Sequence, residues 1–304
     1  MTLDFNIDDA RPRDVLFGIG LHDSTLAIVS TEIEVKQALV EMAQTTWAML
    51  SKHSARHGPP SIYDPSETHS GDRYTVLTLD NDLAQTARWF HTAEGLPEEN
   101  KLLDRLLEMD FYFGRFQDQQ GRRLTAIRKA GGFKGTLNKK GLLQLFGDEL
   151  RLIDEKTFQL DQYFDMLIDN AQLHILKPTQ FETICKMEQA ILGAVPKNLD
   201  VIVQHVPFIH RQSVEVYASK HPRAARFLAS IRQNGFAEDV DQHQLMDACL
   251  AWKIETECSD DGVVIVSDRT MLKFLKMLDM RLYEGGFGIG PKGQFEATGR
   301  SRMS

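Results

Sequence analysis

The chain has 304 residues, of which 42% are hydrophobic and 26% are charged, and its formal net charge at pH 7 is −8. This composition is typical of a soluble globular protein and excludes a largely disordered chain, while the length allows one large domain or two ordinary ones. No run of about 18 apolar residues occurs, so no membrane-spanning helix is expected.

The N-terminal stretch is acidic and has no apolar core, which argues against a secretory signal. Cys185, Cys249 and Cys258 are odd in number and widely spaced. That usage fits a reducing compartment and fits neither a disulfide framework nor a structural zinc site. We therefore expect a cytoplasmic protein with no metal site and no cofactor.

Residues 1–104 are expected to form an N-terminal α/β region, since patterns of both helical and strand period occur in them. The expected elements, in chain order, are a helix over 31–57, a polar loop rich in proline, glycine and serine over 57–72, a strand over 73–79, a helix over 82–93 and a second helix that ends near Met109.

Residues 105–304 are expected to form the second region. From Asp110 the hydrophobic period changes to two, and short strands separated by turn residues predict an antiparallel meander over 110–177. A helical part is expected over 179–280 and a loose, glycine-rich tail over 285–304. In the helical part, the expected elements are helices at 179–195, 197–206, 212–219, 222–233, 241–253 and 269–278, with one strand at 262–267. The whole pattern predicts an α+β fold.

The most basic stretch of the chain runs from Gln120 to Gly147 and contains no Asp or Glu. Such a patch can hold a polyanion even in an acidic protein, because nucleic-acid phosphates bind by charge and counterion release. Its basic residues are Arg122, Arg123, Arg128, Lys129, Lys134, Lys139 and Lys140.

Other roles remain open for these charges. In a strand, Arg123 and Lys129 share one face and Arg122 and Arg128 the other, as in an edge strand protected by charge. The lysines at the end of the segment would serve equally as solubilising side chains. The whole segment would also suit docking on an acidic partner. The glycines at 131–135 would let a main chain approach a phosphate, although a hairpin turn accounts for them more simply.

Catalytic patterns are weak. The sequence has no G-x-S-x-G element, no local signature of a catalytic cysteine and no metal-binding arrangement of histidines. Asp154, Asp161, Asp165 and Asp169 could be imagined as a nuclease metal site, but the (D/E)-x-K companion is absent and Asp169 reads as part of a hairpin turn. Turn and surface roles are favoured for these residues, and we expect no enzymatic activity.

The order of segments resembles a known family. An aromatic strand (FYFGRF) precedes a basic strand (LTAIRK) and a Lys-rich loop, and a later strand (GVVIVS) precedes LKFLKMLDMRLY. Between them lies GDELRLIDEKTFQLDQYFDMLIDNAQLHILKPTQFE, which looks like the core of the KwaB-like family, the soluble component of the Kiwa anti-phage defence system. The resemblance covers about residues 105–285. The residues that carry its central part are Leu152, Asp154, Phe158, Leu160, Asp161, Phe164, Asp165, Asp169, Asn170, Ile175, Leu176, Phe181 and Glu182.

The resemblance implies a cytoplasmic protein that works beside a small multi-pass membrane protein, KwaA, and so lies close to the inner membrane. It also implies DNA binding, interference with phage replication and late gene expression, and a homodimer. It implies no catalytic residues. We therefore predict an anti-phage effector that binds DNA non-specifically through the seven basic residues. The alternatives are an adaptor that docks on a membrane protein or anionic lipid, and a metal-dependent nuclease.

Overall fold

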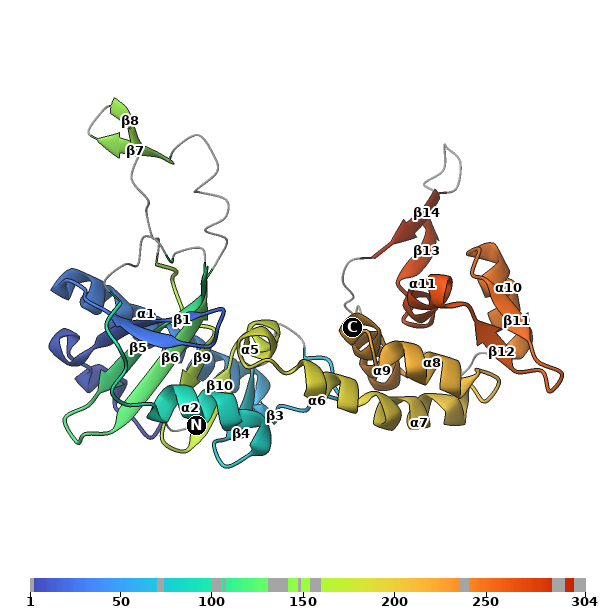
Figure 1. Ribbon diagram of the computed structural model, residues 1–304, viewed down its shortest axis with the longest axis horizontal. Coiled ribbons are helices and arrows are strands. Elements are labelled where there is room, and N and C mark those ends of the chain that lie inside the picture. Colours follow the sequence, from blue (N-terminus) through green and yellow to red (C-terminus); the bar gives the residue numbers. More distant parts are fainter. Residues whose placement is uncertain are drawn as a thin grey trace. The chain divides into compact units, whose positions relative to one another are not determined.

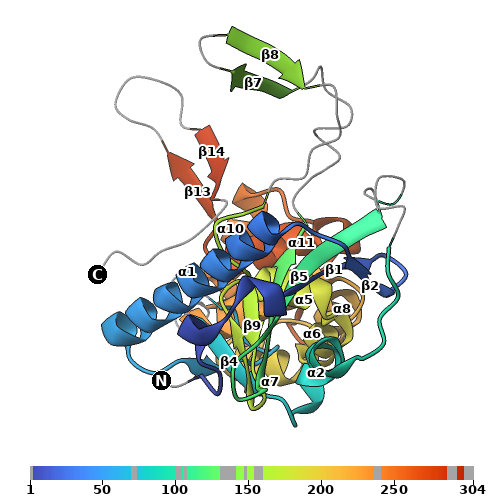
Figure 2. The same ribbon diagram turned by 90° about the vertical axis from the view of Figure 1, so that its left-hand side faces the viewer.

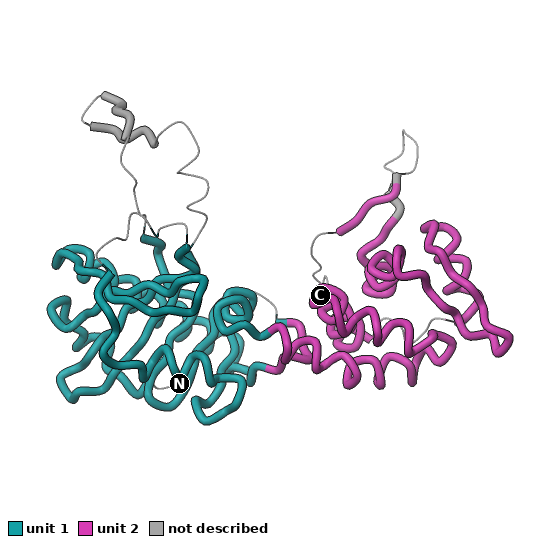
Figure 3. Tube along the Cα trace, in the orientation of Figure 1, with its two compact units in different colours: residues 1–63, 69–187 teal, residues 64–68, 188–304 magenta. Residues whose placement is uncertain are grey.

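The protein is seen in a computed structural model that describes residues 3–69, 74–99, 105, 108–130, 142–146, 149–153, 160–235, 241–285 and 293–297. The chain forms two compact units (Figure 3). The first comprises residues 1–63 and 69–187, and the second comprises residues 64–68 and 188–304. Both helices and strands are present, which confirms the expected α+β class.

Within the described residues, the first unit is built on an eight-stranded sheet (Figure 1). The strand order is β2-β1-β5-β6-β9-β10-β4-β3, and every neighbouring pair is antiparallel except β3 and β4. The strands are β1 (Leu16–Leu21), β2 (Leu26–Val29), β3 (Ser61–Ile62), β4 (Thr75–Thr78), β5 (Met109–Gln117), β6 (Arg123–Lys129), β9 (Met166–Ile168) and β10 (Gln172–Ile175).

The strands β5, β6, β9 and β10 are consecutive neighbours and form the expected meander. Two other expected members, β7 (Leu142–Phe146) and β8 (Glu149–Ile153), instead pair only with each other in a separate hairpin among the described strands. The alternative that the basic strand is an edge strand does not hold, because β6 lies between β5 and β9.

The boundary expected at residue 104 does not coincide with the division into units. Strands from residues before 104 extend the meander on both sides, with β1 beside β5 and β4 beside β10. The helix expected to end near Met109 lies almost wholly outside the described residues.

Helices cover both faces of this sheet (Figures 1 and 2). Side chains of successive strand residues point to opposite faces of a sheet. Tyr112 and Phe116 of β5 accordingly enter the core that also contains residues of α1. Phe111 points to the other face, where its ring centroid lies 4.9 Å from that of Phe90 in α2. The helical elements of the first unit are η1 (Ile7–Asp9), η2 (Pro12–Asp14), α1 (Ile33–His57), η3 (Asp82–Ala84), α2 (Gln85–Thr92) and α5 (Pro178–Ile184).

The second unit is mainly helical. Its α9 is buried along most of its length and packs against α6, α7, α8 and α11. The helices are α6 (Glu188–Gly193), α7 (Val195–His205), α8 (Arg211–Ala218), α9 (Pro222–Asn234), α10 (Gln242–Ala251) and α11 (Asp268–Leu278). The strands are β11 (Thr256–Cys258), β12 (Val264–Val266), β13 (Leu282–Gly285) and β14 (Gly293–Glu296), paired as two hairpins.

Two expectations for this half need correction. The helix expected over 179–195 is divided into α5 and α6, because the chain turns at Lys186, whose φ is +53°. The tail expected to be loose over 285–304 contains β14, which pairs with β13, and residues 298–304 lie outside the described part.

A short piece of the loop expected at 57–72 belongs to the second unit. Lys197 of α7 lies 3.0 Å from Asp64, and Arg226 of α9 donates to the carbonyl oxygens of Pro65 and Glu67 at 3.3 and 2.7 Å. Ser66 is buried. Contacts to two helices therefore fix residues 64–68 in this unit.

Candidate nucleic-acid interface

The predicted phosphate-binding residues have different surroundings in the structure. Arg122 precedes β6, Arg123 begins it, and Arg128 and Lys129 end it. The remaining three, Lys134, Lys139 and Lys140, lie outside the described residues. The predicted faces of the strand are correct, since Leu124 and Ala126 belong to the core that includes α1 and Thr125 contacts His91 of α2.

Arg122 stabilises the turn between β5 and β6. Its Nε donates to the carboxylate of Asp118 at 2.7 Å, and the buried Asp118 also accepts from the backbone N–H groups of Gln120 and Arg122. Burial opposes ionisation of Asp118, but the hydrogen bonds from Arg122 and the backbone outweigh it and lower the pKa of this carboxyl. Asp118 lies only two residues before the basic segment, so the charge of Arg122 is compensated locally.

Arg123 forms a hydrogen bond with the C-terminal end of α2. Its guanidinium donates to the carbonyl oxygen of His91 at 3.1 Å and lies 3.5 Å from Glu94. The buried Arg115 of β5 donates to the carbonyl oxygens of Phe90 and Ala93. Carbonyl groups in the last turn of a helix lack partners within it and carry partial negative charge, so two arginines stabilise this end.

Arg128 is the centre of a partly buried ion-pair cluster. Its guanidinium donates to Asp165 at 2.6 Å and to Asp161 at 3.0 Å, and only 1% of the Asp165 side chain is exposed. Burial alone would lower the pKa of Arg128, but the hydrogen bond to Asp161 and the charges of both carboxylates raise it. Burial raises the pKa of Asp165, so this carboxylate depends on Arg128 and on the backbone N–H of Lys129, at 2.8 Å, to stay ionised.

A cavity of about 450 Å³ opens at this end of β6. We call it the Tyr163 pocket, and it is lined by Arg128, Lys129, Ala130, Tyr163, Asp165, Lys177 and Gln180.

Two cationic side chains lie close to the aromatic ring of the Tyr163 pocket. The Arg128 guanidinium lies 4.8 Å and the Lys177 ammonium 5.8 Å from the ring centroid of Tyr163, both within the range of cation–π attraction. Lys129 and Lys177 have no carboxylate partner among the described residues, in contrast to Arg128. The pocket therefore presents two lysines that are free to bind an anion.

The carboxylates considered as a nuclease site are used in other ways. Asp161 and Asp165 bind Arg128, and the buried Asp169 accepts from the backbone N–H groups of Ala171 and Gln172 in the β9–β10 turn. The turn expected at Asp169 is correct, whereas the expected surface position of Asp165 is not. Asp154 lies outside the described residues, and no three His, Cys, Asp or Glu side chains within the described ranges form a metal-binding group.

Sequence reasoning did not find Tyr163, Lys177 or Gln180. Tyr163 belongs to a quoted aromatic run, and Lys177 precedes Pro178 at the start of α5. Neither position stands out in the sequence, because only the pairing of β6 with β9 and the return of the chain through β10 bring them to Lys129.

Fold and pocket define an α+β protein in two units, with a cationic cavity on the sheet of the first. The sequence model of the family described as "Kiwa protein KwaB-like" matches residues 108–285, more than half of the chain. The chain belongs to this family, as the resemblance indicated, and is a component of the Kiwa anti-phage defence system. The matched region includes every residue that lines the Tyr163 pocket.

No curated protein and no solved structure gives a match to the chain. Among the described helices, none is both long enough and apolar enough to cross a bilayer.

Proposed function

We propose that this protein is a non-enzymatic anti-phage effector that binds DNA without sequence preference and hinders phage replication and transcription. The observation that supports this best is the Tyr163 pocket, where Lys129 and Lys177 lack carboxylate partners among the described residues. The backbone leaves this pocket at Ala130 and continues directly into the segment that carries Lys134, Lys139 and Lys140. Lys129, Lys134, Lys139 and Lys140 thus fall within twelve consecutive residues of the sequence, and Lys177 lines the same pocket as Lys129.

The chemistry of the pocket favours contacts with the DNA backbone. Lysine is a compact point charge that suits phosphate oxygens, and contacts to phosphates position a duplex without reading its sequence. Arg128 and Lys177 both lie within cation–π range of the Tyr163 ring, so the ring holds cations in the pocket. Arg128 supports the Tyr163 pocket from within through its two carboxylate partners, whereas Arg122 and Arg123 lie at the other end of β6 and bind partners there.

Two further parts of the proposal concern assembly. We propose that the protein acts beside the membrane protein KwaA, which would place it at the inner membrane without a span of its own. We also propose a homodimer, because two copies of the Tyr163 pocket on one DNA would raise the overall affinity without new contacts. Sedimentation of the purified protein, alone and with a DNA long enough for two copies, tests the second part.

The DNA proposal is tested by fluorescence anisotropy of a short labelled duplex at several salt concentrations. In a plot of log K against log salt concentration, each phosphate contact contributes about −0.9 to the slope. We expect Lys129→Gln/Lys177→Gln to flatten the slope by about 1.8 and Lys134→Gln/Lys139→Gln/Lys140→Gln to flatten it by about 2.7. A matched control is Lys52→Gln/Lys220→Gln, which removes two exposed lysines elsewhere.

Equal effects of the Lys129/Lys177 pair and the control pair would reject the pocket as the contact. Absence of any DNA binding would reject the effector proposal. Competition by anionic liposomes without DNA binding would instead support an adaptor that docks on lipid. Magnesium-dependent cleavage of plasmid by clean protein, lost in Asp161→Ala, would support the nuclease.

A further inference from the structure

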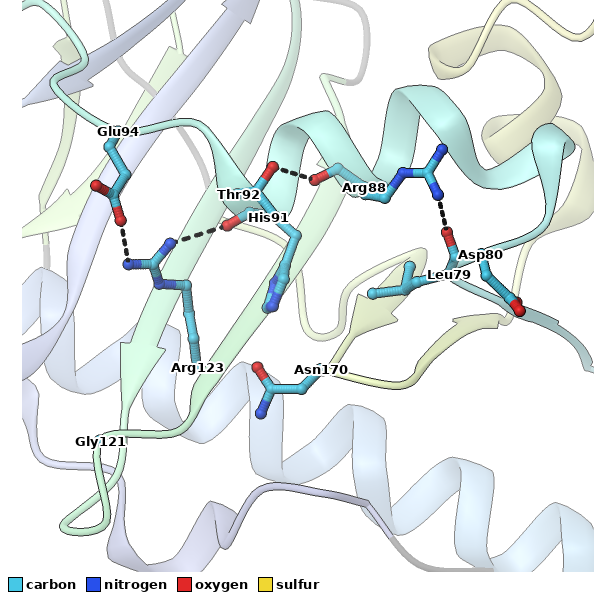
Figure 4. A pocket seen from close by; sticks show the side chains of 9 residues that line it. All are labelled: Leu79, Asp80, Arg88, His91, Thr92, Glu94, Gly121, Arg123 and Asn170. Carbon is cyan, nitrogen blue, oxygen red and sulfur yellow. Dashed lines mark hydrogen bonds and ion pairs between the residues drawn. The ribbon is translucent and has the colours of Figure 1, made fainter.

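A second cavity lies at the opposite end of β6, beside the C-terminal half of α2 and the β9–β10 turn (Figure 4). Its volume is about 530 Å³. We call it the His91 pocket. Arg88 and His91 come from α2, Arg123 from β6 and Asn170 from the β9–β10 turn. Most of its lining residues precede residue 108, so the family match does not extend to the greater part of this site.

Two guanidinium groups are the cationic groups in the lining of the His91 pocket. Arg88 donates to the carbonyl oxygen of Leu79 at 2.8 Å and has no carboxylate partner among the described residues. Arg123 donates to the carbonyl oxygen of His91, and its ion-pair partner among the described residues, Glu94, lies 3.5 Å away with a side chain that is 80% exposed. The carbonyl contacts fix both guanidinium groups in place and leave further N–H donors for a ligand.

Neutral hydrogen-bonding groups lie between the two arginines. In Figure 4 the His91 ring and the Asn170 amide point toward one another. His91 is buried and its Nδ1 lies 3.0 Å from the hydroxyl of Thr125. Burial lowers the pKa of His91, so the ring is uncharged near neutral pH and acts through hydrogen bonds. The hydroxyl of Thr92 donates to the carbonyl oxygen of Arg88, which leaves its oxygen able to accept.

Carboxylates complete the lining. Asp80 and Glu94 are both exposed residues at the border of the pocket. Carboxylates accept hydrogen bonds from hydroxyl groups, and they repel a ligand that carries several adjacent negative charges. Apart from the imidazole of His91, none of the described lining residues has an aromatic ring on which a base could stack. The lining therefore matches a ligand with one anionic group and several hydroxyl groups.

We propose that the His91 pocket binds a sugar phosphate, with the phosphate held by Arg88 on one side of the pocket and the sugar hydroxyls held by Asn170, Thr92 and the carboxylates. The ligand is either a free sugar phosphate or a nucleoside monophosphate, which share this chemistry. The site is separate from the Tyr163 pocket, and the proposal does not depend on DNA binding.

The test is calorimetric titration of the full chain with ribose 5-phosphate, AMP, ribose, adenosine and ATP. We expect binding of ribose 5-phosphate or AMP at millimolar concentration or below, no binding of ribose or adenosine, and weaker binding of ATP than of AMP. Binding of AMP alone would identify the nucleotide as the source, and binding of ribose 5-phosphate alone the free sugar phosphate. Both outcomes support the proposal. Absence of binding by both phosphates, or binding of ribose as tight as that of its phosphate, would overturn it.

Variants locate the site. Arg88→Met keeps the aliphatic stem and removes the guanidinium, and we expect it to weaken phosphate binding by roughly 10-fold to 100-fold, the usual cost of a lost hydrogen bond between charged groups. Arg13→Met removes an exposed arginine of the same unit and should leave binding unchanged. Lys129→Gln/Lys177→Gln should also leave it unchanged, which separates this proposal from DNA binding.

If Arg88→Met does not fold, Asn170→Asp gives the same test. Asn170 is exposed in a turn, and an added carboxylate there should repel the phosphate and weaken binding at least as strongly. Unchanged binding in a folded Arg88→Met or Asn170→Asp variant would reject the His91 pocket as the site.

Discussion

Arg128 and Lys129 are adjacent in the sequence but have opposite electrostatic surroundings. Arg128 points to the face of β6 that carries Ala126 and meets two carboxylates, whereas Lys129 points to the other face and meets none among the described residues. Whether a basic side chain of this strand is paired with carboxylates therefore depends on the strand face that it occupies. Its formal charge alone does not determine whether it can bind a phosphate.

Arg128→Met is expected to destabilise the protein by about 3–5 kcal/mol. The substitution leaves Asp165, with 1% of its side chain exposed, as an unpaired buried carboxylate. Urea unfolding at pH 7 measures the change. Arg13→Met, which removes an exposed arginine, should change the free energy of unfolding by less than about 0.5 kcal/mol.

The double variant Arg128→Met/Asp165→Asn separates charge from packing. Because it removes both members of the buried pair, we expect it to recover part of the lost stability. A double variant no more stable than Arg128→Met would show that the loss comes from packing around Tyr163 and not from the unpaired charge.

At the scale of elements, phenylalanine rings of β5 pack over glycines of the neighbouring strand β1. Gly18 pairs with Phe113 and Gly20 with Phe111 across the two strands. A Cβ atom added at Gly18 would lie 2.2 Å from the Phe113 ring, and one added at Gly20 would lie 2.1 Å from the Phe111 ring. The small residues of β1 thus make room for the aromatic residues of β5, which in turn pack toward α2 through Phe90.

Gly18→Ala is expected to lower the free energy of unfolding by about 1–3 kcal/mol, because the methyl group must displace a packed ring. Calorimetric or denaturant unfolding measures the effect. Gly193→Ala provides the control, since nothing lies within 4 Å of a Cβ at Gly193 in α6. That control should be neutral or slightly stabilising, and an equal loss in both variants would contradict the role of the ring.

Much of the element content could be predicted from the sequence, and the exceptions have identifiable causes. The meander strands and α7 to α11 follow clear hydrophobic periods. In β1, two glycines interrupt the alternation, so no strand was expected at Leu16–Leu21. At Lys186 a positive φ occurs on a residue that carries no turn signal, and the division between α5 and α6 was missed.

The candidate site was less accessible from the sequence. The basic strand was recognised, but the ion-pair partners of Arg123 and Arg128 are Glu94, Asp161 and Asp165, which lie 29 to 37 residues away in the sequence. Tertiary pairing alone brings them together. The same holds for the His91 pocket, where β6, α2 and the β9–β10 turn each supply part of the lining.

At the scale of the whole molecule, the second unit depends on residues 64–68. Partial burial opposes ionisation of Asp64, but hydrogen bonds from the hydroxyl and backbone N–H of Ser66 and the pairing with Lys197 lower its pKa to about 2. The unfolded value is about 3.9. Because the folded pKa lies below the unfolded one, this stabilisation is complete above about pH 4 and is lost as the pH falls toward 2.

Asp64→Asn should therefore lower the Tm at pH 7, and the difference from the unaltered chain should narrow as the pH falls below about 4. Scanning calorimetry across this range measures it. Asp247→Asn, on an exposed part of α10, should change the Tm little at any pH. A Tm difference that stays constant down to pH 2 would show that the effect does not come from the ionised carboxylate.

The placement of residues 64–68 also limits how this protein can be divided. A gene segment that encodes only residues 188–304 omits Asp64 and the buried Ser66, to which Lys197 and Arg232 are bonded. The helical unit is consequently not a portable module that recombination could transfer by a single cut after residue 187. Exchange between related genes would preserve both units only when the short inner piece and the long C-terminal stretch come from the same parent.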